Sequence, residues 1–87
     1  MPRVTFTGNL KAHVEAPPAD VRAATVREAL EQVFAKNPRL RGYVLDDQGA
    51  VRRHVVIFVN GEPIEDRLAQ SDPASGEIAV MQALSGG

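Results

Sequence analysis

The chain is organised around its C-terminal stretch, Gly76-Glu77-Ile78-Ala79-Val80-Met81-Gln82-Ala83-Leu84-Ser85-Gly86-Gly87. Apolar residues alternate between two faces in the first part of this stretch, which predicts a strand over residues 77–82. Two glycines then follow, and because glycine has no Cβ they fit a narrow channel that excludes any other residue. We therefore predict a flexible diglycine tail over residues 83–87, with the carboxylate of Gly87 offered to another protein's active site. The alternative is an end segment without a task.

Length and composition indicate one small globular domain, which we expect to span residues 1–82. The chain has 87 residues, of which 44% are hydrophobic and 24% charged, so it supports a modest core but no deeply enclosed active site. Cysteine is absent, which excludes disulfides, thiolate catalysis and thiolate metal sites. No run has the length of a signal-peptide core or a membrane span. We therefore expect a cytoplasmic protein with no membrane contact.

Charge is distributed unevenly along the chain. Residues 1–45 carry seven Lys and Arg against four Asp and Glu, whereas residues 46–87 carry three against seven. Such asymmetry steers a partner of opposite charge, although two solvated faces of a small domain give the same pattern. The run Arg52-Arg53-His54 has two interpretations as well: it binds a phosphate or an acidic partner loop, or it is solvated. The net charge of -1 and the low aromatic content of 5% disfavour nucleic-acid binding.

Signals for a catalytic or metal site are weak. His13 and His54 are far apart in sequence and have no third ligand at suitable spacing, so they make a poor zinc site. Asp46 and Asp47 are expected to form a turn rather than an acid/base pair. No glycine pattern matches a phosphate-binding loop.

The first fifth of the chain predicts a β-hairpin. Residues 3–7 alternate in hydrophobicity and indicate a first strand. A turn over residues 8–10 and a second strand over residues 11–15 would complete the hairpin. Two prolines lie within residues 16–20, and because proline cannot donate to a sheet we expect the pattern to break there.

The clearest helix signal begins at Thr25. With Glu28 three residues later, Thr25 forms a capping box, in which each side chain satisfies a backbone donor of the first turn. The apolar residues that follow fall on one stripe of a helix: Val26, Ala29, Leu30, Val33 and Phe34. We expect the helix to end near residues 36–38, because Asn37 suits a C-terminal cap and Pro38 cannot continue the ladder.

The second half of the chain predicts short strands separated by turns. The expected segments are a strand over residues 43–45, a turn over 46–49, a long strand over 51–60, a tight turn at Asn60-Gly61, a brief strand or single helical turn over 62–68, and a turn over 71–76. The end of the long strand is apolar on both faces, as in a central strand or in one whose second face awaits a partner.

The predicted element order, β-β-α-β-β-β, indicates an α+β domain. One amphipathic helix would cover one face of a mixed sheet of four to five strands. A small β-grasp, or ubiquitin-like, domain satisfies this order economically. In that arrangement the last strand lies centrally and the tail leaves from one edge of the body.

Three short motifs are recognisable together: Phe58-Val59-Asn60-Gly61, Gly76-Glu77-Ile78-Ala79-Val80-Met81 and Leu84-Ser85-Gly86-Gly87. In this order the chain resembles the MoaD/ThiS family of ubiquitin-like sulfur carrier proteins over nearly its whole length. Residues 39–43 and 53–60 look most like the branch that serves amino-acid biosynthesis. Residues 73–77 depart from the family, which more often has an Asp-Gly-Asp turn at this place.

This resemblance implies a protein on which other enzymes act. A ubiquitin-activating-type enzyme would use ATP and magnesium to adenylate the carboxylate of Gly87, and a sulfur donor such as a sulfurtransferase would displace AMP to leave a thiocarboxylate. A third enzyme, of cysteine, thiamin or molybdopterin type, would accept the sulfur. The chain itself would bind no cofactor or metal, supply no catalytic residue and be a monomer when alone.

The resemblance also implies which residues meet the partners. The residues that would enter the partner's active site are Leu84, Ser85, Gly86 and Gly87. The residues that would dock on the partner are Met81, Leu84 and Phe58. For Met81 and Phe58 the alternative is ordinary core packing.

Two other functions stay open at this point. A ubiquitin-like modifier would use the same adenylate and be joined to protein lysines through Gly87. A plain protein-binding module would not use its tail at all.

Overall fold

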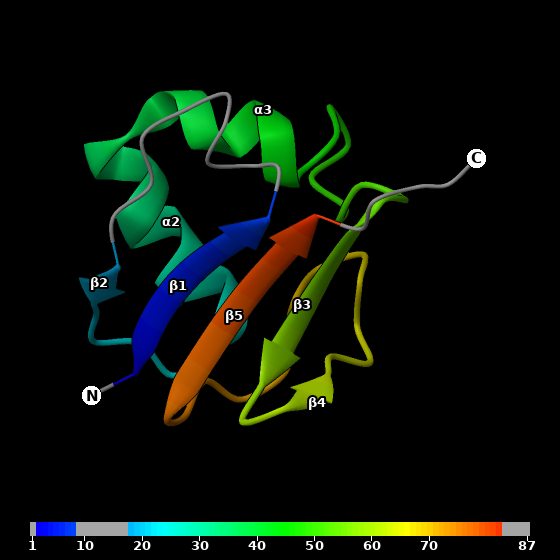
Figure 1. Ribbon diagram of the computed structural model, residues 1–87. Coiled ribbons are helices and arrows are strands. Elements are labelled where there is room, and N and C mark those ends of the chain that lie inside the picture. The colour runs from blue at the N-terminus through cyan, green and yellow to red at the C-terminus, as the bar shows by residue number, and fades with distance from the viewer. Residues whose placement is uncertain (1, 9–17, 83–87) are drawn as a thin grey trace.

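The structure, a computed structural model, describes residues 2–8 and 18–82, and residues 1, 9–17 and 83–87 lie outside the described part. Its elements in chain order are β1 (Arg3–Gly8), β2 (Ala19–Asp20), α2 (Val26–Lys36), the 3-10 helix η1 (Pro38–Leu40), α3 (Arg41–Val44), β3 (Val55–Val59), β4 (Glu62–Pro63) and β5 (Glu77–Gln82). The strands form one five-stranded sheet in the order β2-β1-β5-β3-β4 (Figure 1). The last strand is central, as the sequence predicts, and runs parallel to β1 and antiparallel to β3.

The first strand is confirmed as β1, whose Val4 and Phe6 are buried. Its antiparallel partner in the described part of the chain is the two-residue β2, through the pairs Val4–Ala19 and Arg3–Asp20. The prediction that residues 16–20 interrupt the strand pattern is therefore wrong for Ala19 and Asp20. These two residues follow the prolines, have backbone N–H groups and pair with β1. The strand predicted over residues 11–15 lies outside the described residues.

The central strand β5 forms the middle of the core. Ile78 and Val80 are both 0% exposed, and Val80 lies between Phe6 of β1 and Ile57 of β3. Apolar side chains in register on three neighbouring strands pack closely against one another. The strand predicted over residues 77–82 is confirmed at both ends.

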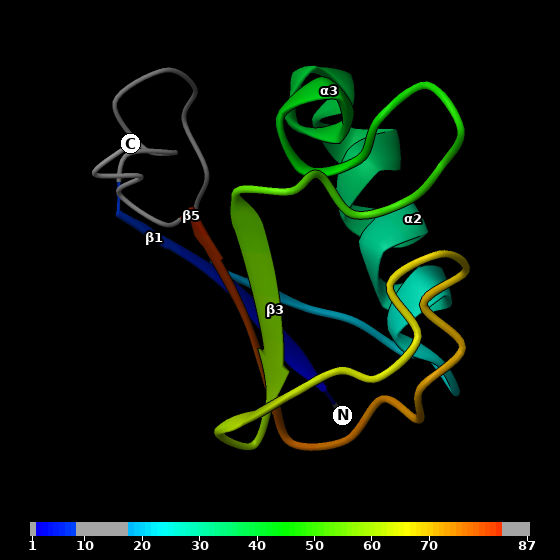
Figure 2. The same cartoon turned by 90° about the vertical axis from the view of Figure 1, so that its right-hand side faces the viewer.

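Helix α2 covers one face of this sheet and begins at the predicted cap. The N–H of Glu28 donates to Thr25 Oγ1 at 3.2 Å, and Glu28 Oε1 accepts from the N–H of Ala24 at 2.9 Å, one residue before the donor that a capping box uses. The predicted apolar stripe is buried along its whole length. In Figure 2, which views the sheet from its side, α2 and α3 lie on one side of the strands and no described helix lies on the other.

The strand predicted over residues 43–45 is wrong, because most of this segment is the helix α3. Leu40 and Val44 are both buried, at 1% and 0% exposure, whereas Gly42 between them is exposed. A strand would put all three residues on one face, so this pattern is that of a helix. Pro38 opens the preceding 3-10 helix, where its fixed φ is tolerated. Leu45 forms only an isolated bridge with Val51.

The long strand predicted over residues 51–60 is shorter in the structure, where β3 begins at Val55. Its first part is a turn, in which the N–H of Val55 donates to the carbonyl of Arg52 at 3.0 Å. The N–H of Val51 and that of Arg52 bond to other segments, the carbonyls of Arg67 and Val44. Because these donors are already satisfied, the backbone does not need a strand partner there.

The turns predicted over residues 46–49 and at Asn60-Gly61 are confirmed, whereas the turn predicted over residues 8–10 falls largely outside the described residues. Gly49 has a φ of 81°, and Asp46 Oδ1 closes its turn by accepting from the N–H groups of Gln48 and Ala50. Asn60 and Gly61 have φ values of 50° and 87°, as a tight hairpin turn between β3 and β4 requires. Residues 62–68, predicted as a brief strand or a helical turn, contain the short strand β4.

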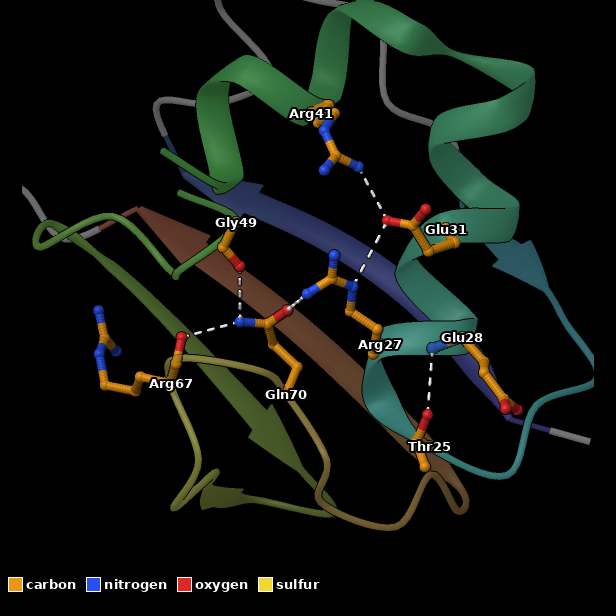
Figure 3. A network of polar contacts seen from close by, with 8 residues as sticks. All are labelled: Thr25, Arg27, Glu28, Glu31, Arg41, Gly49, Arg67 and Gln70. Atoms are coloured by element: carbon orange, nitrogen blue, oxygen red, sulfur yellow. Dashed lines mark hydrogen bonds and ion pairs between the residues drawn. The ribbon is translucent and has the colours of Figure 1, made fainter. Parts of the chain in front are cut away.

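The loop that leads to β5 is fastened to α2 by a buried glutamine. Gln70, which is 0% exposed, donates from Nε2 to the carbonyls of Gly49 at 3.2 Å and Arg67 at 2.8 Å (Figure 3). Its backbone carbonyl accepts from the N–H of Arg27 at 2.9 Å. The sequence did not reveal this residue, because glutamine is mostly exposed in proteins. The contacts fix the path by which the chain returns to the central strand.

Candidate functional site: an apolar sheet face at the root of the tail

The predicted tail residues Leu84, Ser85, Gly86 and Gly87 lie outside the described residues. The structure describes the root of the tail, Gln82, which pairs with Gly8 of β1 on one side and with Val55 of β3 on the other. The chain after Gln82 therefore continues from the centre of the sheet. Because backbone ladders hold this strand on both sides, the tail has a rigid base.

The two described residues of the predicted docking surface lie on the sheet face that α2 and α3 leave open. Met81 is 42% exposed, and Phe58 is half-buried. Strand alternation puts both opposite the buried pair Ile57 and Val80, since successive side chains of a strand point to opposite faces. The structure thus places Phe58 outside the core that α2 covers. That these residues dock on a partner stays a prediction.

Two residues that the sequence analysis did not select belong to the same face. Ala79 pairs with Phe58, and Val56 pairs with Met81, so the four side chains form a small apolar quartet. We call these residues, Val56, Phe58, Ala79 and Met81, the apolar face. The alternation within residues 55–59 was the signal that could have found Val56. Beside the apolar face lies a hollow of about 440 Å³, lined by Phe58, Asn60, Gly61, Glu77, Ala79 and Met81.

The start of β5 is fixed by a side-chain clamp from the hairpin turn. Asn60 Oδ1 accepts from the N–H of Glu77 at 2.9 Å, and Asn60 Nδ2 donates to Ser75 Oγ at 3.1 Å. The clamp fits closely over Gly76, where a Cβ would lie 2.1 Å from Asn60 Oδ1. Gly76 also has a φ of 59°. The turn predicted over residues 71–76 therefore forms although residues 73–77 depart from the family sequence.

Two carboxylates with lowered pKa values organise the loop between β4 and β5. Asp72 accepts from the N–H groups of Glu65 and Asp66, both at 2.9 Å, which lowers the pKa of its carboxyl from 3.8. The hydroxyl of Ser71, followed by the N–H of Ala69, lowers the pKa of Asp66. Because structural hydrogen bonds keep both groups ionised, neither is suited to proton transfer near neutral pH.

Within residues 2–8 and 18–82, no three His, Asp or Glu side chains come close enough to hold a metal ion. His13, one of the two histidines considered above, lies outside this part. No helix in the same part of the chain is both long and apolar enough to cross a membrane.

Comparison of the sequence with known proteins gives two matches. A family model described as the ThiS family matches residues 4–87. Small archaeal modifier protein 1 of Haloferax volcanii is 33% identical over 64 residues, which cover 74% of this chain and 71% of the relative.

Comparison of the structure with solved ones gives the same picture. The crystal structure of SAMP1 from Haloferax volcanii superposes with a TM-score of 0.72 at 29% identity, covering 99% of this chain and 98% of that one. A chain in the crystal structure of the Amycolatopsis orientalis BexX/CysO complex superposes with a TM-score of 0.81 at 17% identity, covering 100% of both chains, a likeness that concerns the fold alone. The expected β-grasp, ubiquitin-like fold is thereby confirmed.

Proposed function

The chain belongs to the ThiS family, and on that premise we propose that it is a sulfur carrier whose Gly87 carboxylate is converted to a thiocarboxylate. Members of the family are small ubiquitin-like carriers or modifiers on which partner enzymes act, and they are not catalysts themselves. The chain is accordingly a protein substrate. Its sulfur would serve a biosynthetic enzyme of cysteine, thiamin or molybdopterin type.

The chemistry follows from the weakness of a carboxylate as an electrophile. An adenylating partner of the ubiquitin-activating type joins the Gly87 carboxylate to the α-phosphate of ATP, and pyrophosphate leaves. The acyl adenylate carries a good leaving group, so sulfur at the sulfide level attacks the acyl carbon, AMP leaves and a thiocarboxylate remains. A persulfide on the donor would first give an acyl disulfide, which a thiol would then reduce to the thiocarboxylate. Its sulfur is then a soft nucleophile for a third enzyme.

The observation that carries this proposal is the position of the diglycine sequence. It follows β5 after Ala83, Leu84 and Ser85, and β5 is the central strand, held on both sides. A body anchored in this way presents the tail to a deep channel, which glycines at 86 and 87 allow because they carry no side chain.

The apolar face supplies the recognition surface in this proposal. Met81, Phe58 and Leu84 dock on the partner, and Leu84, Ser85, Gly86 and Gly87 enter its active site. An exposed apolar group next to a reactive end is typical of a protein interaction site.

The proposal assigns ATP and magnesium to the adenylating partner rather than to this chain. The remaining partners are a sulfur donor such as a sulfurtransferase and the sulfur-accepting enzyme. Because adenylation consumes ATP, the chain would work in the cytoplasm. We propose that it is a monomer when no partner is bound.

A second candidate function is that of a protein modifier, because the relative with 33% identity is named a modifier protein. A modifier would form the same adenylate and then be joined to lysines of other proteins through Gly87. The two functions differ in product: a thiocarboxylate for the carrier and an isopeptide conjugate for the modifier. A plain binding module would form neither.

Intact-mass spectrometry of the protein isolated from its own cells separates these functions. A carrier is expected to show a fraction that is heavier by about 16 Da at the C-terminus, because sulfur replaces oxygen. Lysine conjugates without any such fraction would favour the modifier. If neither a thiocarboxylate nor a lysine conjugate is found, the remaining function is a plain protein-binding module.

A further inference from the structure

A second hollow lies at the end of the sheet where β5 stops. It is an open hollow of about 290 Å³, and the described residues that line it are Gly42, Tyr43, Arg52, His54 and Gln82. Val55, the first residue of β3, pairs with Gln82, the last residue of β5, so the turn that carries Arg52 and His54 lies beside the root of the tail. Figure 1 shows the start of β3, the tip of β5 and α3 at the same end of the molecule. We call this feature the root hollow.

The root hollow is basic and lacks a described counter-charge. None of its described lining residues is acidic, and Arg53, which is exposed, lies between two of them in sequence. The ion pairs among the described residues are both made by Glu31, with Arg27 and with Arg41. Arg52, Arg53 and His54 therefore have no carboxylate partner within the described part of the chain.

Two polar side chains of the root hollow have distinctive surroundings. The Nε–H of Arg52 donates to the carbonyl of Gly42 at 2.7 Å, which fixes the arginine against α3. Gln82 Oε1 is shielded from solvent and accepts no hydrogen bond from any described residue. A shielded polar atom of this kind costs free energy unless a partner satisfies it. Because the oxygen and nitrogen of a side-chain amide exchange places by a half rotation, Gln82 can present either a donor or an acceptor here.

The length of the tail decides between a protein and a nucleotide as the ligand. Five residues follow Gln82, and five extended residues span at most about 17 Å. When Gly87 reaches the α-phosphate in the partner's channel through a fully extended tail, Gln82 lies about 17 Å from that phosphate, toward the mouth of the channel. The group that meets the root hollow there belongs to the protein surface around that mouth.

We propose that the root hollow, with Arg52, Arg53 and His54, binds an acidic side chain on the adenylating partner, next to the entrance of its channel. This inference rests on the proposed function and adds a charged contact to the apolar face. The guanidinium of Arg52 and the imidazole of His54 donate to the carboxylate, Gln82 donates its amide N–H, and Arg53 attracts the charge from the rim. Opposite charges at an interface act mainly on encounter and register, so the contact sets how often the tail enters the channel in the right orientation.

The test uses the full chain and the ubiquitin-activating-type enzyme encoded in the same genome, with pyrophosphate release as the measurement. Arg53→Glu reverses an exposed charge and breaks no side-chain hydrogen bond or ion pair to another described residue, so it leaves the fold intact. We expect it to raise the KM for the carrier about tenfold with little change in kcat, and to lose most of this effect in high salt. Arg53→Lys should behave like the unaltered chain. Arg22→Glu, a reversal at an exposed arginine between β2 and α2, is the matched control and should leave the KM unchanged.

Two results would overturn the inference while leaving the proposed function in place. One is an unchanged carrier KM for Arg53→Glu. The other is a raised KM for ATP instead of for the carrier, which would mean that a nucleotide phosphate occupies the root hollow. If the unaltered chain releases no pyrophosphate with the enzyme, the proposed function fails and the inference fails with it.

Discussion

Gly76 is the residue on which the geometry of the last strand depends most directly. Its φ of 59° lies in the left-handed region, and an added Cβ would lie 2.1 Å from Asn60 Oδ1. We expect Gly76→Ala to lower the free energy of unfolding by about 2 kcal/mol, because it strains the backbone and displaces the Asn60 clamp. Urea unfolding followed by circular dichroism measures this.

Gly42→Ala is the matched control for that substitution. Gly42 lies in α3, and an added Cβ meets nothing within 4 Å. Because alanine favours helices over glycine, the change should be neutral or should stabilise the protein by about 0.5–1 kcal/mol. Equal losses for both variants would show that the clamp is not what requires glycine at position 76.

Deletion of Gly87 tests the tail as a reactive group. The deletion moves the terminal carboxylate back by about 3.5 Å, out of reach of a phosphate held for in-line attack. We expect adenylation by the partner to fall by at least about a hundredfold, with an unchanged thermal midpoint, because β5 ends at Gln82. Pyrophosphate release and thermal unfolding measure the two effects. An unchanged rate would eliminate both the carrier and the modifier and leave the binding module.

Among the elements, the loop between β4 and β5 owes its shape to ionised carboxylates. The pKa of Asp72 is lowered in the folded state from 3.8 by N–H donors of Glu65 and Asp66. Between the lowered pKa of the folded state and the value of 3.8 in the unfolded state, the unfolded chain binds more protons than the folded one. The stability that Asp72 contributes is therefore fully present above about pH 3.8 and is lost as the pH falls through the lowered pKa. We expect Asp72→Asn to have a lower thermal midpoint near neutral pH and a shallower loss of that midpoint between about pH 5 and pH 2. If the thermal midpoints of Asp72→Asn and of the unaltered protein fall equally steeply over this pH range, the ionised carboxylate of Asp72 does not stabilise the loop.

The elements that sequence predicts well are those whose signals are local. The cap at Thr25 and the stripe of α2 need only the 3.6-residue period, and the turn at Asn60-Gly61 needs only its φ preference. The segment from Leu40 to Leu45 has a short apolar run that suits a strand and a helix equally. Contacts remote in sequence decide its form, since Leu40 and Val44 both enter the core. The shorter β3 also results from a contact remote in sequence. The N–H of Val51 donates to the carbonyl of Arg67 and is therefore not available for pairing with a neighbouring strand.

At the scale of the whole molecule, the sequence selected Phe58 and Met81 of the apolar face but not Val56 and Ala79. Val55 and Ile57 alternate with Val56 and Phe58, and all four are apolar, so periodicity cannot say which pair faces the core. The position of α2 settles it, because the helix buries Val55 and Ile57 and leaves the other pair on the open face. The root hollow could not be predicted from the sequence either, because its residues come from three separate segments: α3, the turn before β3 and the end of β5.

Met81→Asp tests whether the apolar face binds the partner without contributing much to stability. Met81 is 42% exposed but lies within the central strand, so Met81→Asp should lower the free energy of unfolding by only about 1 kcal/mol. In the complex the same carboxylate would be buried without a partner, and we expect the KM for the carrier in pyrophosphate release to rise at least tenfold, about 1.4 kcal/mol or more. Leu68→Asp is the control, because Leu68 is 77% exposed and lies in the loop that packs toward α2. Equal losses of activity for both variants would mean that any new surface charge weakens binding, and the apolar face would then have no special role.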